Sequence, residues 1–262
     1  MLFSFSAISS DTVRQIEFSP PPHMTKAKVW TYNPVKKLSA VLVICPGMNG
    51  SAESFVRNRE WQEFCFENGL GLMGLSFASL PSDLYAGRGY TFPDQGSGDL
   101  LLKALQESFH EDLPIILYGF SSGAYFTELF VSWKPERVLT WCAHATGHYA
   151  RLSSAPPPGI ISCGELDPGR YGGALAFFKE NRVAGGNVLW IGVPGLAHKT
   201  SLDLDLFVKA YFSTVVQRKG VPTWVDIDYK IEISHKKAKE NPSLSGWIPC
   251  KSLLKSWQDL GK

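Results

Sequence analysis

The feature of this sequence that most constrains its fold is the pentapeptide Gly-Phe-Ser-Ser-Gly at residues 119–123, together with its surroundings. An apolar run typical of a buried strand, residues 114–118, precedes it, and a helix-like run, residues 124–130, follows it. This context predicts a sharp strand-to-helix turn, because the two glycines let strand and helix approach closely. Ser121 is then held in a strained conformation with its hydroxyl projecting outward. A serine in an ordinary glycine turn is the simpler alternative, and the flanking strand and helix argue against it.

Short apolar runs alternate with amphipathic stretches along most of the chain. Residues 13–18 and 26–33 come first, and we expect them to form an antiparallel pair at one edge of a sheet. The strand-like runs that follow are residues 40–45, 70–77, 114–118, 138–145, 159–163 and 187–193. Helix-like stretches between and after them include residues 54–68, 98–109, 171–183 and 204–217. This order predicts an α/β fold with a mostly parallel central sheet and helices on both of its faces.

Composition and charge exclude some classes of function. The 262 residues carry a formal net charge of +2, and the basic residues are scattered apart from residues 236–239, so we expect no nucleic-acid partner. No stretch is apolar for long enough to span a bilayer, so we expect no membrane partner. Five cysteines without a C-x-x-C pair indicate buried thiols, neither a disulfide framework nor a zinc site. With an N-terminus unlike a secretory signal, they favour a cytoplasmic location.

Loops at the carboxyl ends of the predicted strands can supply partners for Ser121, since such loops surround one crevice in an open parallel sheet. One follows residues 159–163 and carries Asp167, and another follows residues 187–193 and carries His198. A serine hydroxyl is a poor nucleophile near neutral pH, so it needs a base within hydrogen-bond reach. That base needs an acceptor to fix its tautomer. We therefore predict Ser121 as the nucleophile, His198 as the base and Asp167 as the orienting acid.

A third loop at the same edge, residues 46–50, is rich in glycine and follows the strand-like run at residues 40–45. Its backbone amides can point into the crevice, and so can the amide of the residue that follows the nucleophile. We predict that the amides of Met48 and Ser122 donate hydrogen bonds to an oxyanion.

On these residues the chain resembles the serine esterases of the α/β-hydrolase fold, in the style of the bacterial dienelactone-hydrolase, feruloyl-esterase and polyhydroxyalkanoate-depolymerase-like branch. The resemblance covers roughly residues 40–217. In that superfamily the nucleophile, the acid and the histidine follow one another along the chain, and Ser121, Asp167 and His198 match this order. The Pro46-Gly47-Met48 turn resembles the His-Gly-x oxyanion turn of the family, with Pro46 in place of the histidine.

The domain organisation follows from the same pattern. We expect an α/β-hydrolase catalytic domain over residues 1–220. An appendage over residues 221–262 should pack on this domain through its aromatic side chains, among them Trp224, Trp247 and Trp257. Only residues 146–158 separate two of the predicted strands, which leaves no room for a large cap domain, so the pocket should be open.

Other residues at the predicted site leave alternatives. Glu165 precedes Asp167 by two positions and is the second candidate for the acid. His144 and His148 lie near the carboxyl end of the run at residues 138–145, and we assign a substrate contact to His148. A metal site built from these two histidines and Asp167 is conceivable, but no helical i, i+4 pair supports it, so we expect neither a metal nor another cofactor.

The loop at residues 78–97 is long for a connection in a compact domain, and such loops are often functional. It carries Tyr85, Tyr90 and Phe92, which we predict to bind the apolar or aromatic part of a substrate. The alternative is that these rings only pack the loop against the domain.

These expectations converge on a carboxylic ester hydrolase that acts on small or aromatic esters through an acyl-enzyme. A serine peptidase or a thioesterase would carry the same three residues. An alternative of another class is a hydrolase-fold protein that binds a ligand with little turnover. The expected partner is therefore a small-molecule ester, and the sequence leaves the acyl and alcohol specificity and the oligomeric state open.

Overall fold

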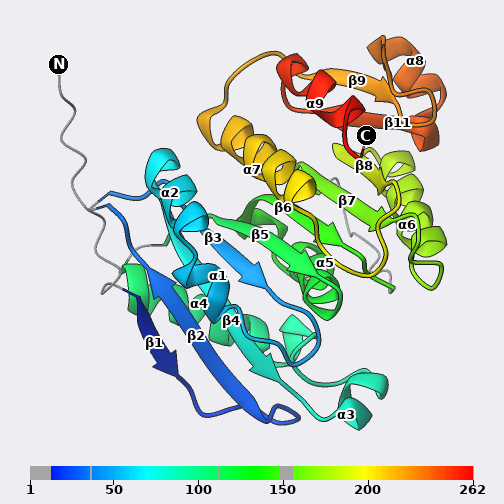
Figure 1. Ribbon diagram of the computed structural model, residues 1–262. Coiled ribbons are helices and arrows are strands. Elements are labelled where there is room, and N and C mark those ends of the chain that lie inside the picture. The colour runs from blue at the N-terminus through cyan, green and yellow to red at the C-terminus, as the bar shows by residue number, and fades with distance from the viewer. Residues whose placement is uncertain (1–12, 36, 111, 148–155, 262) are drawn as a thin grey trace, which may run out of the picture.

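The computed structural model describes residues 13–35, 37–110, 112–147 and 156–261. These residues form an eight-stranded sheet in the order β1-β2-β4-β3-β5-β6-β7-β8 (Figure 1). The strands are β1 (Arg14–Glu17), β2 (Lys26–Tyr32), β3 (Ala40–Cys45), β4 (Leu70–Ala78), β5 (Ile115–Phe120), β6 (Val138–His144), β7 (Gly159–Gly164) and β8 (Val188–Val193). Strands β3 to β8 are parallel, and β1 and β2 form an antiparallel edge next to β4. The predicted mostly parallel sheet and its antiparallel edge are thus confirmed.

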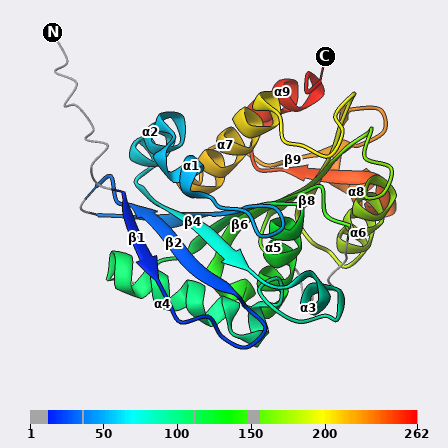
Figure 2. The ribbon, with the colours of Figure 1, turned by 60° about the horizontal axis from the view of Figure 1, so that its bottom comes forward.

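Helices cover both faces of this sheet (Figure 2). On one face lie α1 (Glu53–Arg57), α2 (Arg59–Asn68) and α7 (Leu202–Gln217). On the other lie α4 (Ser97–Phe109), α5 (Ser122–Trp133) and α6 (Tyr171–Val183). Strands enclosed in this way are mostly apolar, and every residue of β3 and of β7 is buried. The core therefore consists of two apolar layers, one on each side of the sheet.

The helical stretch predicted at residues 54–68 is two helices. The break falls at Asn58, whose backbone is extended with ψ 125°. Its side-chain oxygen accepts a hydrogen bond from the amide of Trp61 at 3.2 Å, so Asn58 ends α1 and caps α2. Helix α2 ends at Gly69, which is left-handed with φ 64°, a conformation that glycine adopts readily after a helix.

The C-terminal residues form a small antiparallel sheet that the sequence analysis did not predict. Its order is β10-β9-β11, with β9 (Thr223–Asp226), β10 (Ile231–Ile233) and β11 (Ser245–Ile248), and it carries α8 (His235–Glu240) and α9 (Leu254–Gln258). It lies beside β8, α6 and α7, at the orange and red end of Figure 1. The indole N–H of Trp257 donates to the carbonyl of Trp190 at 3.1 Å, and the guanidinium of Arg182 lies 4.5 Å from the ring centre of Trp224. Aromatic side chains thus join this part to the main sheet.

The remaining short elements lie in connections. The long loop after β4 contains α3 (Pro81–Tyr85) and a 3₁₀ turn at Pro93–Gln95. Further 3₁₀ turns are found at Pro135–Arg137, Pro242–Leu244 and Lys251–Leu253.

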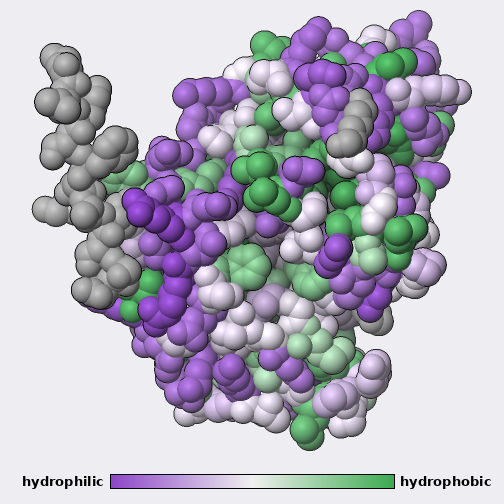
Figure 3. Space-filling view, in the orientation of Figure 1, coloured by the Kyte–Doolittle hydropathy of each residue, from purple (hydrophilic) through white to green (hydrophobic). Residues whose placement is uncertain are grey.

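Two predictions made from composition also concern the folded surface and interior. All five cysteines are free thiols, and Cys250 is the one that is not fully buried, as expected for thiols inside apolar runs. Within the described ranges, no helix has the length and apolar character needed to cross a bilayer. Hydrophilic and hydrophobic residues are interspersed over the face shown in Figure 3.

Candidate active site

Ser121 occupies the turn between β5 and α5 in the conformation that the sequence predicts. Its backbone has φ 55° and ψ −121°, a region that non-glycine residues rarely adopt. The Ser121 amide donates to the carbonyl of His144 at 2.9 Å, and its own carbonyl accepts from the amide of Tyr125 at 3.1 Å. A strained serine held from both sides is the geometry of a nucleophile elbow.

The glycines on either side of Ser121 are required by close backbone approach. A Cβ atom on Gly123 would overlap the carbonyl oxygens of Cys45 and Pro46, so the start of α5 rests directly on the end of β3. A Cβ atom on Gly119 would overlap the carbonyl oxygen of Gly123. The pattern of the pentapeptide therefore reflects the packing of β3, β5 and α5 against one another.

The structure brings Ser121, His198 and Asp167 together at the carboxyl edge of the sheet. Nε2 of His198 lies 3.0 Å from Oγ of Ser121, and its Nδ1 lies 2.7 Å from Oδ2 of Asp167. Because a carboxylate only accepts hydrogen bonds, Nδ1 carries a proton, and in the neutral ring Nε2 can then accept from the serine hydroxyl. The three side chains thus form one continuous hydrogen-bonded chain.

Asp167, the predicted acid, is almost completely buried, with 4% of its side chain exposed. Its other oxygen, Oδ1, accepts a hydrogen bond from the Arg170 guanidinium at 3.2 Å. Glu165, the alternative acid, has an exposed side chain, and it is Asp167 that reaches the imidazole. The sequence analysis did not identify Arg170. Its position three residues after Asp167 is the feature that could have indicated this ion pair.

A second histidine, His144, supports the loop that carries His198. Its Nδ1 lies 2.9 Å from the hydroxyl of Ser162 and its Nε2 lies 2.9 Å from the carbonyl of Lys199. Burial lowers the pKa of His144 to about 4, so the ring is neutral near pH 7. Since a carbonyl only accepts, Nε2 donates to Lys199 and Nδ1 accepts from Ser162. Both ring nitrogens are therefore engaged, which argues against the metal site considered from the sequence.

One aromatic ring connects the two histidines. The ring of Phe120 stacks on His144 with 5.8 Å between centres, and lies 5.0 Å from the ring centre of His198. Phe120 is the second residue of the pentapeptide, so the same turn that exposes Ser121 also supports the imidazole next to it.

The two residues predicted to stabilise an oxyanion lie next to Ser121. Ser122 is the first residue of α5, where backbone N–H groups have no partner within the helix. A Cβ atom placed on Gly47 would lie 3.7 Å from Cβ of Ser121, so the turn that contains Met48 rests against the serine. In this turn the amide of Gly50 donates to the carbonyl of Gly47 at 2.9 Å, whereas the amide of Met48 has no partner among the described residues.

A cavity of about 590 Å³ opens beside Ser121. Two of the four predicted substrate-binding residues, Tyr85 and Phe92, line it. Tyr90 does not line it and is buried, 4% exposed, and His148 lies outside the described residues. Further lining residues that the sequence analysis did not name are Leu84, Gly87, Thr91, Tyr125, Gly147, Gly169 and Arg170.

Comparison with solved structures identifies the architecture. An esterase from the archaeon Pyrobaculum calidifontis superposes with a TM-score of 0.58 at 12% identity, over 78% of this chain and 85% of that one. The chain has the α/β-hydrolase fold. A fluorophosphonate-binding serine hydrolase of Staphylococcus aureus matches 78% of this chain and 98% of its own, with a TM-score of 0.56 and 14% identity. A carboxyl esterase from Bacillus coagulans gives 0.55 and 13%, over 79% and 98%.

No family model matches the sequence, and no curated protein matches it either. The strand order and the Ser121 turn therefore show the α/β-hydrolase fold. The sequence identity to the solved structures, 12–14%, supports the fold alone. Within this fold, the carboxyl edge of the sheet is where the Ser121 turn, the Asp167 loop and the His198 loop meet.

Proposed function

We propose that this protein is a serine carboxylic ester hydrolase that works through an acyl-enzyme. The observation that carries the proposal is the hydrogen-bonded chain from the Ser121 hydroxyl through His198 to the buried carboxylate of Asp167. The strained elbow and the esterases among the solved structures of the same fold support it. We extend the proposal to the dienelactone-hydrolase, feruloyl-esterase and polyhydroxyalkanoate-depolymerase-like branch that the sequence resembles.

The proposed reaction has two halves. His198 takes the proton of Ser121 as the hydroxyl attacks the ester carbonyl, and the same imidazole then protonates the leaving alcohol. Water attacks the acyl-enzyme in the second half, again with His198 as base, and the acid is released. Asp167 holds the imidazole in the tautomer that accepts at Nε2 and stabilises the imidazolium. The amides of Met48 and Ser122 are the proposed donors to the oxyanion in both halves.

The proposed substrates are small or aromatic esters in solution. The cavity of about 590 Å³ beside Ser121 is large enough for a compact ester, and the rings of Tyr85 and Phe92 offer apolar contact. A thioesterase or a peptidase would use the same three residues, so ester, thioester and peptide substrates should be compared directly. Dissolved esters should be hydrolysed in preference to emulsified long-chain triglyceride, without a jump in rate when the emulsion forms.

The decisive experiment replaces the nucleophile. Ser121→Ala should lower the turnover of p-nitrophenyl esters by about a million-fold, because the hydroxyl is a covalent participant. A fluorophosphonate probe should label the parent protein at Ser121 and leave the variant unlabelled. Ser256→Ala, at an exposed serine of α9, is the matched control and should keep full activity and labelling. Activity of more than a few per cent in Ser121→Ala would reject the assignment.

The alternative of a hydrolase-fold protein that only binds a ligand has its own signature. Such a protein would turn over every small ester slowly and close to stoichiometrically, although the probe could still label its Ser121. Steady turnover of a p-nitrophenyl ester over many cycles therefore separates an enzyme from a binding protein. The five free thiols agree with the proposed cytoplasmic location, which fractionation of the native cells would test.

A further inference from the structure

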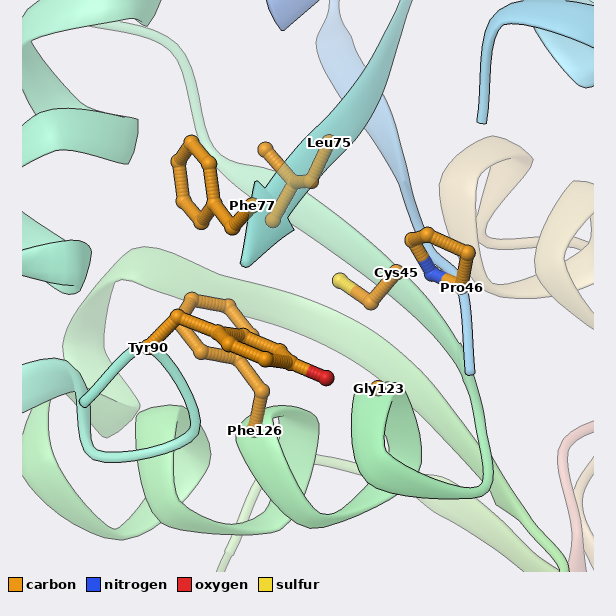
Figure 4. Close-up of a pocket in the computed structure, with 7 residues that line it drawn as sticks. All are labelled: Cys45, Pro46, Leu75, Phe77, Tyr90, Gly123 and Phe126. Atoms are coloured by element: carbon orange, nitrogen blue, oxygen red, sulfur yellow. The ribbon is translucent and has the colours of Figure 1, made fainter. Parts of the chain in front are cut away.

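Tyr90 is the predicted substrate residue that the structure places elsewhere. Its ring is buried and lines a separate small pocket together with Phe77 of β4 and Phe126 of α5 (Figure 4). The ring points its hydroxyl toward the space between Pro46 and Gly123. These two residues belong to the two segments that supply the proposed oxyanion donors. The phenol oxygen therefore lies where the two segments meet.

The hydroxyl of Tyr90 faces both segments. It accepts a hydrogen bond from the amide of Asn49 at 3.2 Å, and it points toward Gly123, the residue after Ser122, at the start of α5. Burial raises the pKa of Tyr90, so the phenol stays protonated and has a hydrogen to donate. A neutral phenol can accept from Asn49 and donate its own hydrogen at the same time. Asn49 follows Met48 directly, so this contact is next to a proposed oxyanion donor.

Asn49 is fixed from a second direction. Its side-chain amide donates to the carbonyl of Ser79 at 3.0 Å, and its side-chain oxygen accepts from the amide of Ser79 at 3.0 Å. The hydroxyl of Ser79 in turn accepts from the amide of Tyr90 at 3.0 Å. The three residues close a ring of hydrogen bonds that joins the turn after β3, the end of β4 and the loop that follows it. Asn49 itself has φ 55°, so its backbone depends on such support.

We propose that Tyr90 is a positioning residue that, with Asn49 and Ser79, sets the distance between the amides of Met48 and Ser122. This inference rests on the proposed function, since it concerns the oxyanion site of that reaction. Donors to an oxyanion act best at about 2.7–3.1 Å from the charged oxygen, so a small shift of one segment weakens them. A strut between the segments keeps both donors in place before the substrate binds.

The test is Tyr90→Phe, which removes the hydroxyl and keeps the ring. We expect kcat for a p-nitrophenyl ester to fall by about ten- to a hundred-fold, somewhat less than for loss of an oxyanion donor itself. KM should stay within about twofold, because the ring does not line the cavity. The affinity for a boronic acid, which forms a tetrahedral adduct on the serine, should fall by the same factor as kcat. The matched control is Tyr211→Phe on α7. It removes a buried hydroxyl that donates to the carbonyl of Gly159 on β7, and it should leave kcat unchanged.

A second variant keeps the test open if Tyr90→Phe does not fold. Asn49→Gly retains the left-handed backbone, loses both side-chain bonds to Ser79, and should show the same fall in kcat without a matching rise in KM. A wild-type kcat and a wild-type boronate affinity in either folded variant would overturn the proposed positioning role. A rise in KM equal to the loss of kcat/KM would overturn it as well, since Tyr90 would then act as part of the pocket wall. If the parent protein is not labelled at Ser121, the proposed function fails instead.

Discussion

Replacing His144 with glutamine should weaken the fall of this protein's unfolding free energy as the pH is lowered from about 6.5 to about 4. Burial at the end of β6 lowers the pKa of this histidine from 6.5 to about 4, against a hydrogen bond to the Lys199 carbonyl that favours its protonation. In the unfolded chain the ring is solvated and titrates near 6.5. Between about pH 6.5 and 4, the unfolded chain therefore binds a proton that the native protein does not.

The sign and size of the effect follow from this difference. The neutral, buried His144 makes its full contribution to the unfolding free energy above about pH 6.5, and this contribution is lost as the pH falls through about 4. The interval between the two pKa values corresponds to about 3 kcal/mol of unfolding free energy, with a slope of at most about 1.4 kcal/mol per pH unit. An effect of this size is a large part of the stability of an ordinary domain.

The glutamine variant separates this titration from the loss of contacts. Its side-chain NH₂ group can replace the donor to the Lys199 carbonyl, but the hydrogen bond from Ser162 is lost, at a cost of about 1–3 kcal/mol at every pH. His144→Gln should therefore be less stable than the parent at pH 8. Because the variant has no imidazole to protonate, the gap should narrow by about 3 kcal/mol on going to pH 4.

The assay is urea unfolding of both proteins at intervals from pH 8 to pH 4, followed by circular dichroism. His110→Gln, at an exposed histidine after α4, is the control for the loss of an imidazole that is not buried. A gap between parent and His144→Gln that is constant with pH would refute the reasoning. It would mean that the buried ring is protonated in the native state as easily as in the unfolded chain.

The remaining predictions concern two carboxylates in or near the site and one in the core. Asp167→Asn should lower kcat by about ten-thousand-fold by favouring the wrong imidazole tautomer, whereas Glu165→Gln should have little effect; the reverse ranking in ester assays would move the acid to Glu165. Glu128 is buried in α5, its oxygens have no hydrogen-bond partner among the described residues, and burial raises its pKa well above the usual range. Glu128→Met should raise the unfolding free energy, with a gain that grows as the pH rises above about 4.5, since only the unfolded wild-type chain then ionises. A gain independent of pH in urea titrations would contradict this.

Much of the fold could be predicted because it depends on local pattern. Strands enclosed between helices are nearly continuous apolar runs, so β3 and β7 can be predicted directly from the sequence, and the alternation with helices implies parallel pairing. The position of the Asp167 and His198 loops follows from the same rule, since the ends of parallel strands share one edge. The C-terminal sheet follows no such rule. Its strands are three or four residues long, too short to show a period, and depend on contacts such as that between Trp257 and Trp190.

The limits of the sequence argument are clearest in the loop after β4. Tyr85, Tyr90 and Phe92 have similar chemistry and lie within eight positions, so composition treats them alike, yet Tyr85 is 83% exposed and Tyr90 4%. What distinguishes Tyr90 is a set of hydrogen-bond partners 11 and 41 positions away, Ser79 and Asn49, and neither separation has a periodic signature. A tyrosine can be buried when its hydroxyl finds a buried acceptor or donor, whereas a tyrosine without such a partner keeps its hydroxyl in water. The residues that hold the proposed oxyanion donors apart therefore become visible only when β3, β4 and α5 are seen packed against one another.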